Sequence, residues 1–201
     1  MKTLALLGTT LGFAFSAGLN LYATVLVIGL AVRVGWVALP GQLSSLAILG
    51  DPIVLGVAGV MYVIEFLADK IPAVDHAWDL VHTFIRPIGA AWIAWRTIGG
   101  AGFSEPGEVA LLLAAGGVAL SAHAGKAGTR LASASVGGHV FGLGVLLSLA
   151  EDVIAFVLTP LAMLQPLLVL AFVLVALCVL AAFIPLTIRA IRRKRRTAPT
   201  P

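Results

Sequence analysis

The chain has few charged residues and a single cysteine. Charged side chains make up 11% of its 201 residues, whereas about a quarter of the residues in a soluble domain are charged. Cys178 lies inside an apolar run, which excludes a disulfide framework and a cysteine-based zinc site. The sequence also lacks the nucleotide-binding pattern G-x-x-x-x-G-K-[ST] and the hydrolase patterns H-E-x-x-H and G-x-S-x-G. We therefore expect no ATP-driven activity from this chain alone and no cofactor.

Hydrophobic residues dominate the composition of the chain. They make up 60% of the chain, and the mean hydropathy is +1.08. A helix needs about 20 apolar residues to cross a bilayer, so most of the chain must lie in lipid. Backbone groups in lipid must be satisfied internally, and the long runs of Leu, Ala and Val lack the alternation of barrel strands. The sequence predicts an all-α, polytopic transmembrane helical bundle.

Six apolar segments can be drawn between stretches rich in proline, glycine and charged residues. The first is too long for a signal peptide and is expected to stay attached, either tilted or broken near Asn20. The third and fourth can be full spans or a re-entrant pair. Residues 1–189 are predicted to form one transmembrane domain, and 190–201 a basic, disordered cytoplasmic tail. The predicted segments are 4–32, 52–68, 87–103, 108–124 (or to 136), 138–160 and 163–188.

Basic residues predict the orientation. With six spans, Lys2, Lys70, Arg86 and the six basic residues from Arg189 to Arg196 fall on one side of the membrane. That side is expected to be cytoplasmic, with both termini there, in a bacterial inner membrane. The formal charge of +4 is then explained by contact with anionic lipid headgroups, not with nucleic acid. Whether the protein forms a homo-oligomer stays open.

The start of the chain recurs weakly in its second half. Residues 6–26 match 111–131 at eight of 21 positions, although abundant Leu, Ala and Gly produce accidental matches. Three spans per half would make 1–103 and 104–189 a 3+3 inverted repeat, an arrangement common in transporters. The matched stretches 16–24 and 121–129 would then lie near the middle of the membrane, where broken helices form binding sites.

Three acidic residues lie away from the ends of the predicted spans. An ionised side chain at the bilayer centre costs about 2.5–3.5 kcal/mol on insertion scales, so Glu65, Glu151 and Asp152 call for an explanation. Neighbouring helical positions point about 100° apart, so Glu151 and Asp152 cannot face one point. Their expected role is to bind protons or cations. The alternative is structural pairing with Arg96, Lys126 or Arg130.

Other polar residues complete the predicted site. Asn20 is a neutral ligand in the first span, and Lys126 and Arg130 are counter-charges or anion ligands. Asp69 and Lys70 are expected at headgroup level, as a solvated helix end.

A candidate metal site lies between the second and third predicted spans. Asp75, Asp79 and His82 stand at i, i+4 and i+7, so two carboxylates and an imidazole share one helix side. The same segment has an apolar side containing Trp78 and Phe84, as in a helix lying at the membrane interface. Both interpretations stay open.

These motifs resemble a known bacterial membrane family. The stretch from Glu65-Phe-Leu-Ala-Asp69-Lys70 to Arg86-Pro87 resembles the central signature of domain of unknown function 4126. Ser16-Ala-Gly-Leu-Asn20, His123-Ala-Gly-Lys126 and Ser148-Leu-Ala-Glu151-Asp152 are similar to its other motifs. Residues 131–139 depart from the family's connection. The resemblance implies a fold and lends no activity.

Three functions follow from these features. The first is a small inner-membrane transporter or channel for an ion or small solute, using the intramembrane carboxylates. The second is a membrane-embedded enzyme acting on a lipid headgroup at the cytoplasmic face, carried by Asp75, Asp79 and His82. The third is a non-catalytic membrane subunit whose charges only hold helices together.

Overall fold

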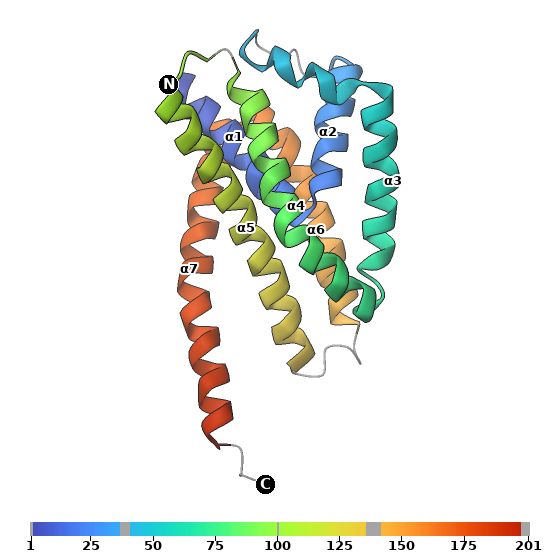
Figure 1. Ribbon diagram of the computed structural model, residues 1–201, viewed down its shortest axis with the longest axis vertical. Coiled ribbons are helices and arrows are strands. Elements are labelled where there is room, and N and C mark those ends of the chain that lie inside the picture. Colours follow the sequence, from blue (N-terminus) through green and yellow to red (C-terminus); the bar gives the residue numbers. More distant parts are fainter. Residues whose placement is uncertain (1, 37–40, 100, 136–141, 198–201) are drawn as a thin grey trace.

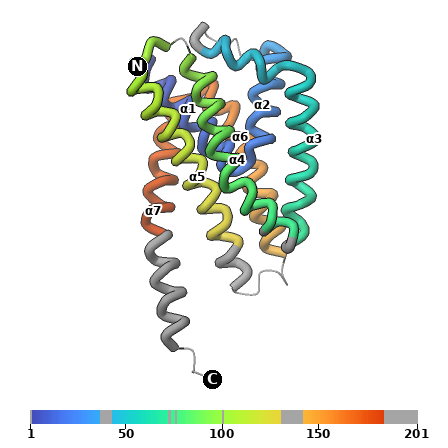
Figure 2. The backbone as a smooth tube through the Cα atoms, viewed as in Figure 1, coloured from blue at the N-terminus to red at the C-terminus, as the bar shows by residue number. Residues whose placement is uncertain are grey.

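The computed structural model describes residues 2–36, 41–99, 101–135 and 142–197, and no strand occurs among them. Figures 1 and 2 show an elongated bundle of helices, with α7 along one side. The elements are α1 (Lys2–Leu19), α2 (Leu21–Arg33), the 3-10 helix η1 (Gly41–Gly50), α3 (Pro52–Ala68), α4 (Pro72–Ile98), α5 (Glu105–Ser135), α6 (Leu143–Leu164) and α7 (Pro166–Thr197).

Several of these helices are long and apolar enough to cross a membrane. There are four such helices in the described chain, or five if Leu43–Gly50 and α3, which meet at 71°, count as one broken span. The predicted class, an all-α membrane bundle, is thereby confirmed. The count of six spans is not, because α4 is absent from this set. That helix carries Asp75, Asp79, Arg86 and Arg96.

The first predicted segment is broken at Asn20, as the sequence suggested. The Asn20 side chain accepts a hydrogen bond from the Ala23 amide and caps α2. In Figure 1, α1 descends from the upper end of the bundle and α2 returns to that end. Gly8 there packs on the Pro166 backbone, and Arg33 donates to the Gly50 carbonyl over 3.2 Å. Helices α1 and α2 therefore form a hairpin that turns inside the bundle.

The hairpin changes the predicted topology. Helices α1 and α2 together do not cross the bundle. The helices from α3 to α7 follow them and run in alternating directions along it (Figure 1). Helix α1 begins at the upper end and α7 finishes at the lower end. The side of the membrane on which each terminus lies stays a prediction.

The 105-residue repeat gains no support from local structure. The stretch 16–24 is broken at Asn20, whereas its counterpart 121–129 continues unbroken within α5. Gly12 packs against Ala162 and Val169, but its counterpart Gly117 faces open space. The matched positions therefore have different surroundings.

The predicted third segment was wrong in its bounds. Helix α4 begins at Pro72 and continues through Pro87, so the expected interfacial helix and the segment 87–103 are one helix. A proline inside a helix is tolerated where neighbouring helices support the backbone, and Gly116 of α5 lies against the Pro87 carbonyl. Helix α7 likewise extends to Thr197, through most of the predicted disordered tail. The predicted start of the fifth segment, residue 138, lies outside the described residues.

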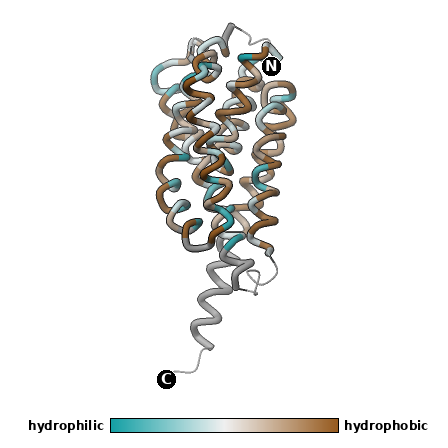
Figure 3. The backbone as a smooth tube through the Cα atoms, turned by 90° about the vertical axis from the view of Figure 1, so that its right-hand side faces the viewer, coloured by the Kyte–Doolittle hydropathy of each residue, from teal (hydrophilic) through white to brown (hydrophobic). Residues whose placement is uncertain are grey.

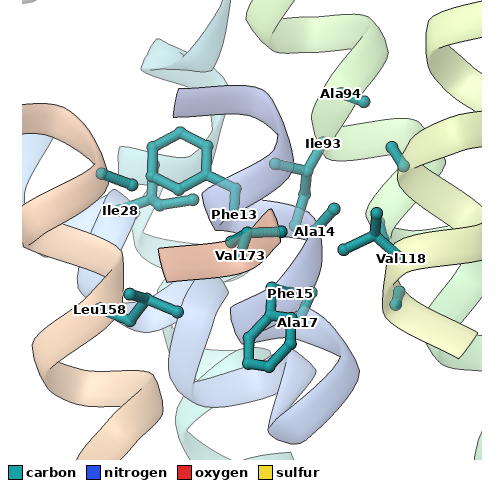
Figure 4. Packing of buried hydrophobic residues seen from close by; sticks show 14 of the residues in the cluster. Phe13, Ala14, Phe15, Ala17, Ile28, Ile93, Ala94, Val118, Leu158 and Val173 are labelled. Carbon is teal, nitrogen blue, oxygen red and sulfur yellow. The ribbon is translucent and has the colours of Figure 1, made fainter. Parts of the chain in front are cut away.

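The core is built around α1. Phe13, Ala14 and Ala17 are fully buried, and α1 contacts α4, α5, α6 and α7. Figure 4 shows Phe13 and Ala14 near Ile93 of α4, with Val118 of α5 beside them. Gly8 and Gly12 permit this close packing, because a Cβ atom at either position would overlap atoms of α6 or α7. Hydrophobic residues dominate along the helices in Figure 3, as expected for a lipid-facing surface.

Candidate functional site

A group of ionisable side chains fills the interior of the lower half of the bundle. They come from the end of α3, the first half of α4, the second half of α5 and the first half of α6, which meet there. We call this group the charged cluster. Its members are Glu65, Asp69, Asp75, Asp79, Arg86, Lys126, Arg130, Glu151 and Asp152.

The deepest ion pair joins Glu65 of α3 to Arg86 of α4. Arg86 Nη2 lies 2.5 Å from Glu65 Oε1, and both side chains are 0% exposed. Arg86 Nη1 donates to the Gly18 carbonyl at the end of α1 over 2.8 Å, and to His123 Nδ1 over 2.9 Å. The guanidinium thus neutralises a buried carboxylate and also meets the negative end of the α1 dipole. Because His123 Nδ1 accepts this bond, the imidazole is neutral.

Lys126 draws three carboxylates together. Its Nζ lies 3.3 Å from Asp69 Oδ2, 3.5 Å from Glu151 Oε2 and 3.8 Å from Glu65 Oε1. Glu65 and Glu151 therefore converge on one ammonium group, although they are 86 positions apart in the sequence (151 minus 65). The predicted site residues Glu65, Glu151 and Lys126 are thus brought into one place.

Arg130 links the cluster to α4. Its Nη2 lies 2.8 Å from Asp69 Oδ2 and 3.0 Å from Glu151 Oε2. Its Nη1 pairs with Asp75 and lies 3.7 Å from Asp79 Oδ2. One guanidinium thereby faces four carboxylates, so Lys126 and Arg130 act as the counter-charges that the sequence suggested.

The structure does not assemble the predicted metal site. Asp75 and Asp79 face Arg130, whereas His82 donates from Nδ1 to the Trp78 carbonyl and lies 3.0 Å from the Tyr22 hydroxyl. Within the described residues, no group of three or more His, Cys, Asp or Glu side chains is placed to hold a metal ion. The reason is electrostatic, because a guanidinium already occupies the position that a cation would take between the two carboxylates.

Asp152 differs from the other acids of the cluster. Its Oδ1 accepts a hydrogen bond from Asn20 Nδ2 over 2.9 Å. Its buried Oδ2 has no hydrogen-bond partner among the described residues, which is also true of one oxygen each of Glu65, Asp69 and Asp79, so the difference lies in the charges around it. No lysine or arginine of the described chain lies within ion-pair distance of it. Glu151 and Asp152 therefore have different partners, as their helical positions predict. Through this hydrogen bond of Asn20, the break between α1 and α2 contacts the charged cluster.

Asp69 is not the solvated helix end that the sequence predicted. It is only 8% exposed, and its Oδ2 accepts hydrogen bonds from Arg130, Lys126 and Ser148. Burial by itself raises the pKa of this carboxyl. The charge of Lys126, the hydrogen bond and charge of Arg130 and the hydrogen bond of Ser148 outweigh that effect, so the pKa of Asp69 lies well below its usual value.

This lowered pKa predicts a dependence of stability on pH. A carboxyl with a lowered pKa in the folded state stabilises the fold above its unfolded pKa of 3.8, and this contribution is lost as the pH falls below that value. We expect the unfolding temperature in detergent to decrease as the pH is lowered through this range. In Asp69→Asn the decrease should be smaller, and the unfolding temperature at neutral pH lower. Glu105→Gln, at an exposed position of α5, is the control and should follow the unmodified protein.

Hydroxyl groups continue the polar interior above the cluster. Thr24 Oγ1 donates to the Asn20 carbonyl and to Ser16 Oγ, which lies 2.6 Å from Thr159 Oγ1. These three hydroxyl groups are fully buried between α1, α2 and α6. We call them the hydroxyl column. Asn20 contacts both Asp152 and this column, so polar groups continue from Asp152 toward the upper half of the bundle.

A separate groove lies between α2, α3 and α4. It has a volume of about 340 Å³, and its lining is almost entirely apolar. Tyr22 lines the groove and also contacts His82, so this residue touches both the groove and α4.

Sequence reasoning missed two members of the site. From the sequence, Arg86 counts only toward the orientation of the chain, because Pro87 suggests a boundary there, and His123 is assigned no role. The available signal was the spacing of the polar residues, since Asp79, Thr83 and Arg86 lie on one side of a helix that continues past residue 87. His123 Nε2 lies 3.1 Å from both Thr83 Oγ1 and the Asp79 carbonyl.

The fold and the site define an all-helical membrane protein with an ionised interior. A family model described as "Domain of unknown function (DUF4126)" matches residues 7–186, and the chain belongs to this family. The resemblance drawn from the motifs is thereby confirmed. No curated protein and no solved structure matches the chain.

Proposed function

We propose that the protein is a small membrane transporter or channel for an ion or small solute, and that the charged cluster is its binding site. The observation that carries this proposal is the excess of carboxylates inside the bundle. Six acidic side chains share the cluster with the three cationic side chains of Arg86, Lys126 and Arg130, and five of the six form ion pairs with them. Lys70 at the edge is bound to Ser148, so the acids remain in excess. A cluster serving only to hold helices together gains nothing from an excess of buried like charge, which costs free energy unless a proton or cation compensates it.

The helix break supports the same function. A discontinuous helix inside a membrane bundle presents the positive end of one half and the negative end of the other to a ligand. Here Asp152 accepts a hydrogen bond from Asn20, which caps the start of α2. Arg86 donates a hydrogen bond to the Gly18 carbonyl at the end of α1. The guanidinium of Arg86 is therefore next to the negative end of the α1 dipole, and the carboxyl of Asp152 is near the positive end of α2.

The charges also support an orientation. The helix segments that carry the charged cluster lie in the lower half of the bundle in Figure 1, toward the end where α7 finishes. Six of the 13 basic residues lie between Arg189 and Arg196, so we assign the lower end to the cytoplasmic side of a bacterial inner membrane, in contact with anionic headgroups. The start of α1 then lies on the opposite side.

Proton flux into proteoliposomes tests this function. Vesicles that contain a pH-sensitive dye and hold a potassium diffusion potential should acidify faster with the protein than without it. In Glu151→Gln, which removes a carboxylate shared by Lys126 and Arg130, we expect flux to decrease by about tenfold or more, equivalent to about 1.4 kcal/mol. Flux that is equal in the variant and the unmodified protein would argue against the proposal.

Glu108→Gln is the matched control. It makes the same chemical change near the start of α5, far from the charged cluster, and should leave flux unchanged. Both variants are compared only as monodisperse protein with equal incorporation into vesicles. If the protein moves no ion and always purifies with one fixed partner, the non-catalytic subunit becomes the better interpretation.

The lipid-directed enzyme is less well supported. Its proposed acid and base residues, Asp75 and Asp79, are held by Arg130, and His82 faces Tyr22. Only the apolar groove beside Tyr22 favours it, because an acyl chain would fit such a surface.

A further inference from the structure

Asp152 is buried without the compensation that the other deep acids have. Glu65 pairs with Arg86, and both Asp69 and Glu151 pair with Lys126 and Arg130. Asp152 is only 6% exposed and has the amide of Asn20 as its hydrogen-bond partner. An ionised carboxylate in such a position is costly, and one free oxygen, Oδ2, remains available for a further bond.

We propose that Asp152 holds an exchangeable proton on Oδ2, while Glu65, Asp69 and Glu151 remain ionised in fixed pairs. This assignment rests on the proposed transport function and identifies its coupling ion as a proton. The step is a simple exchange, in which the O–H bond of the neutral carboxyl breaks, the electron pair stays on the carboxylate and the proton passes to a water molecule.

The surroundings of Asp152 favour a proton over a metal cation. Asn20 uses its Oδ1 to cap α2 at the Ala23 amide, so it must present its NH₂ group to Asp152. A metal cation needs several oxygen ligands, and an N–H donor at this place repels it. A proton needs one oxygen atom only.

A polar route leads from Asp152 in each direction. Toward the lower end, Ser148 lies one turn earlier on α6, where it accepts from Lys70 Nζ over 3.0 Å and donates to Asp69 Oδ2 over 3.0 Å. Toward the upper end, Asn20 leads to the hydroxyl column.

The charged and titratable groups around Asp152 come from three other elements and its own helix. Outside α6 these groups are Glu65 of α3, Asp69 and Lys70 in the segment after α3, and Lys126 of α5. On α6 itself, Glu151 is the adjacent residue. Tyr62 of α3 also interacts with it electrostatically. Lys70 is bound to Ser148 and not to a carboxylate, so it is the cation best placed to approach Asp152 after the proton leaves.

Carbodiimide labelling tests this assignment separately from transport. The apolar reagent dicyclohexylcarbodiimide reacts with protonated carboxyls inside membranes, and peptide mass spectrometry identifies the modified residue. We expect modification at Asp152 at mildly acidic pH, decreasing as the pH is raised and the carboxyl loses its proton. Glu65 and Glu151 should stay unmodified. Asp152→Asn should abolish both the label and proton flux, and Asp152→Glu should retain both in part.

The outcomes separate the two proposals. If Glu65 or Glu151 is labelled in place of Asp152, or if Asp152→Asn transports protons at the normal rate, the assignment to Asp152 is overturned. If Asp152 is labelled with the expected pH dependence but the protein transports nothing, the proton site stands and the transport function falls. If flux depends on Glu151 while Asp152 is never labelled, the transport function stands and the assignment to Asp152 falls.

Discussion

Arg86→Met is expected to lower the free energy of unfolding by about 3–5 kcal/mol, the cost of leaving one member of a buried ion pair uncompensated. The side chain of Arg86 is 0% exposed, and so is that of its partner Glu65. Methionine preserves much of the volume, so the loss reports mainly on charge and hydrogen bonds. Unfolding of the purified protein in mixed micelles with a denaturing detergent measures it.

A double variant makes the result specific. In Arg86→Met with Glu65→Leu, no buried charge is left alone, so the loss should be smaller than in the single variant. Recovery should be incomplete, because the Gly18 carbonyl and His123 also lose their donor. Arg33→Met, at the upper end, serves as the control and should cost far less. A single variant as stable as the unmodified protein would show that Glu65 is not held as an ion.

Gly18→Ala should destabilise the bundle by about 1–3 kcal/mol, the usual cost of forcing an extra carbon into a packed interior. A Cβ atom at Gly18 would overlap the carbonyl oxygen of Ala119 and lie 2.8 Å from both Ala119 Cα and Ala122 Cβ. The obstacle is mainly backbone, which cannot rotate away as a side chain can. Helices α1 and α5 must therefore separate, and the bond from Arg86 to the Gly18 carbonyl is strained as well.

Gly117→Ala on α5 is the matched control for this change. Nothing lies within 4 Å of a Cβ placed there, so the better helix propensity of alanine should leave stability equal or raise it by up to about 1 kcal/mol. The same unfolding assay measures both. If both substitutions cost the same, close contact between α1 and α5 at Gly18 is not the reason for its glycine.

Helix bounds were predictable where sequence punctuation was strong. The segment 52–68 was placed correctly, because Asp51 and Pro52 form a standard helix start. The same reasoning failed at Pro87, which lies inside α4. A proline reads as a boundary in sequence, but a neighbouring helix can support the backbone around it, and only tertiary packing supplies that neighbour.

The candidate site was predicted in its members but not in its connections. Glu65, Glu151, Lys126 and Arg130 were recognisable because charge in an apolar run is costly and so requires a partner or a role. Which cation meets which carboxylate depends on how α3, α4, α5 and α6 rotate against one another. The sequence could not distinguish Arg86 as the partner of Glu65, or Asp152 as the acid without a cation.

The amino-acid sequence by itself determined the membrane class, the helical structure and the family, because these follow from hydropathy, backbone hydrogen bonding in lipid and local motifs. Tertiary structure alone decided that α1 and α2 turn back within the bundle, so that α1 begins and α7 finishes at opposite ends of it. A break at Asn20 is a local property. The direction that the chain takes after it depends on contacts of α2 with η1, α3 and α6, which only the folded chain brings against it.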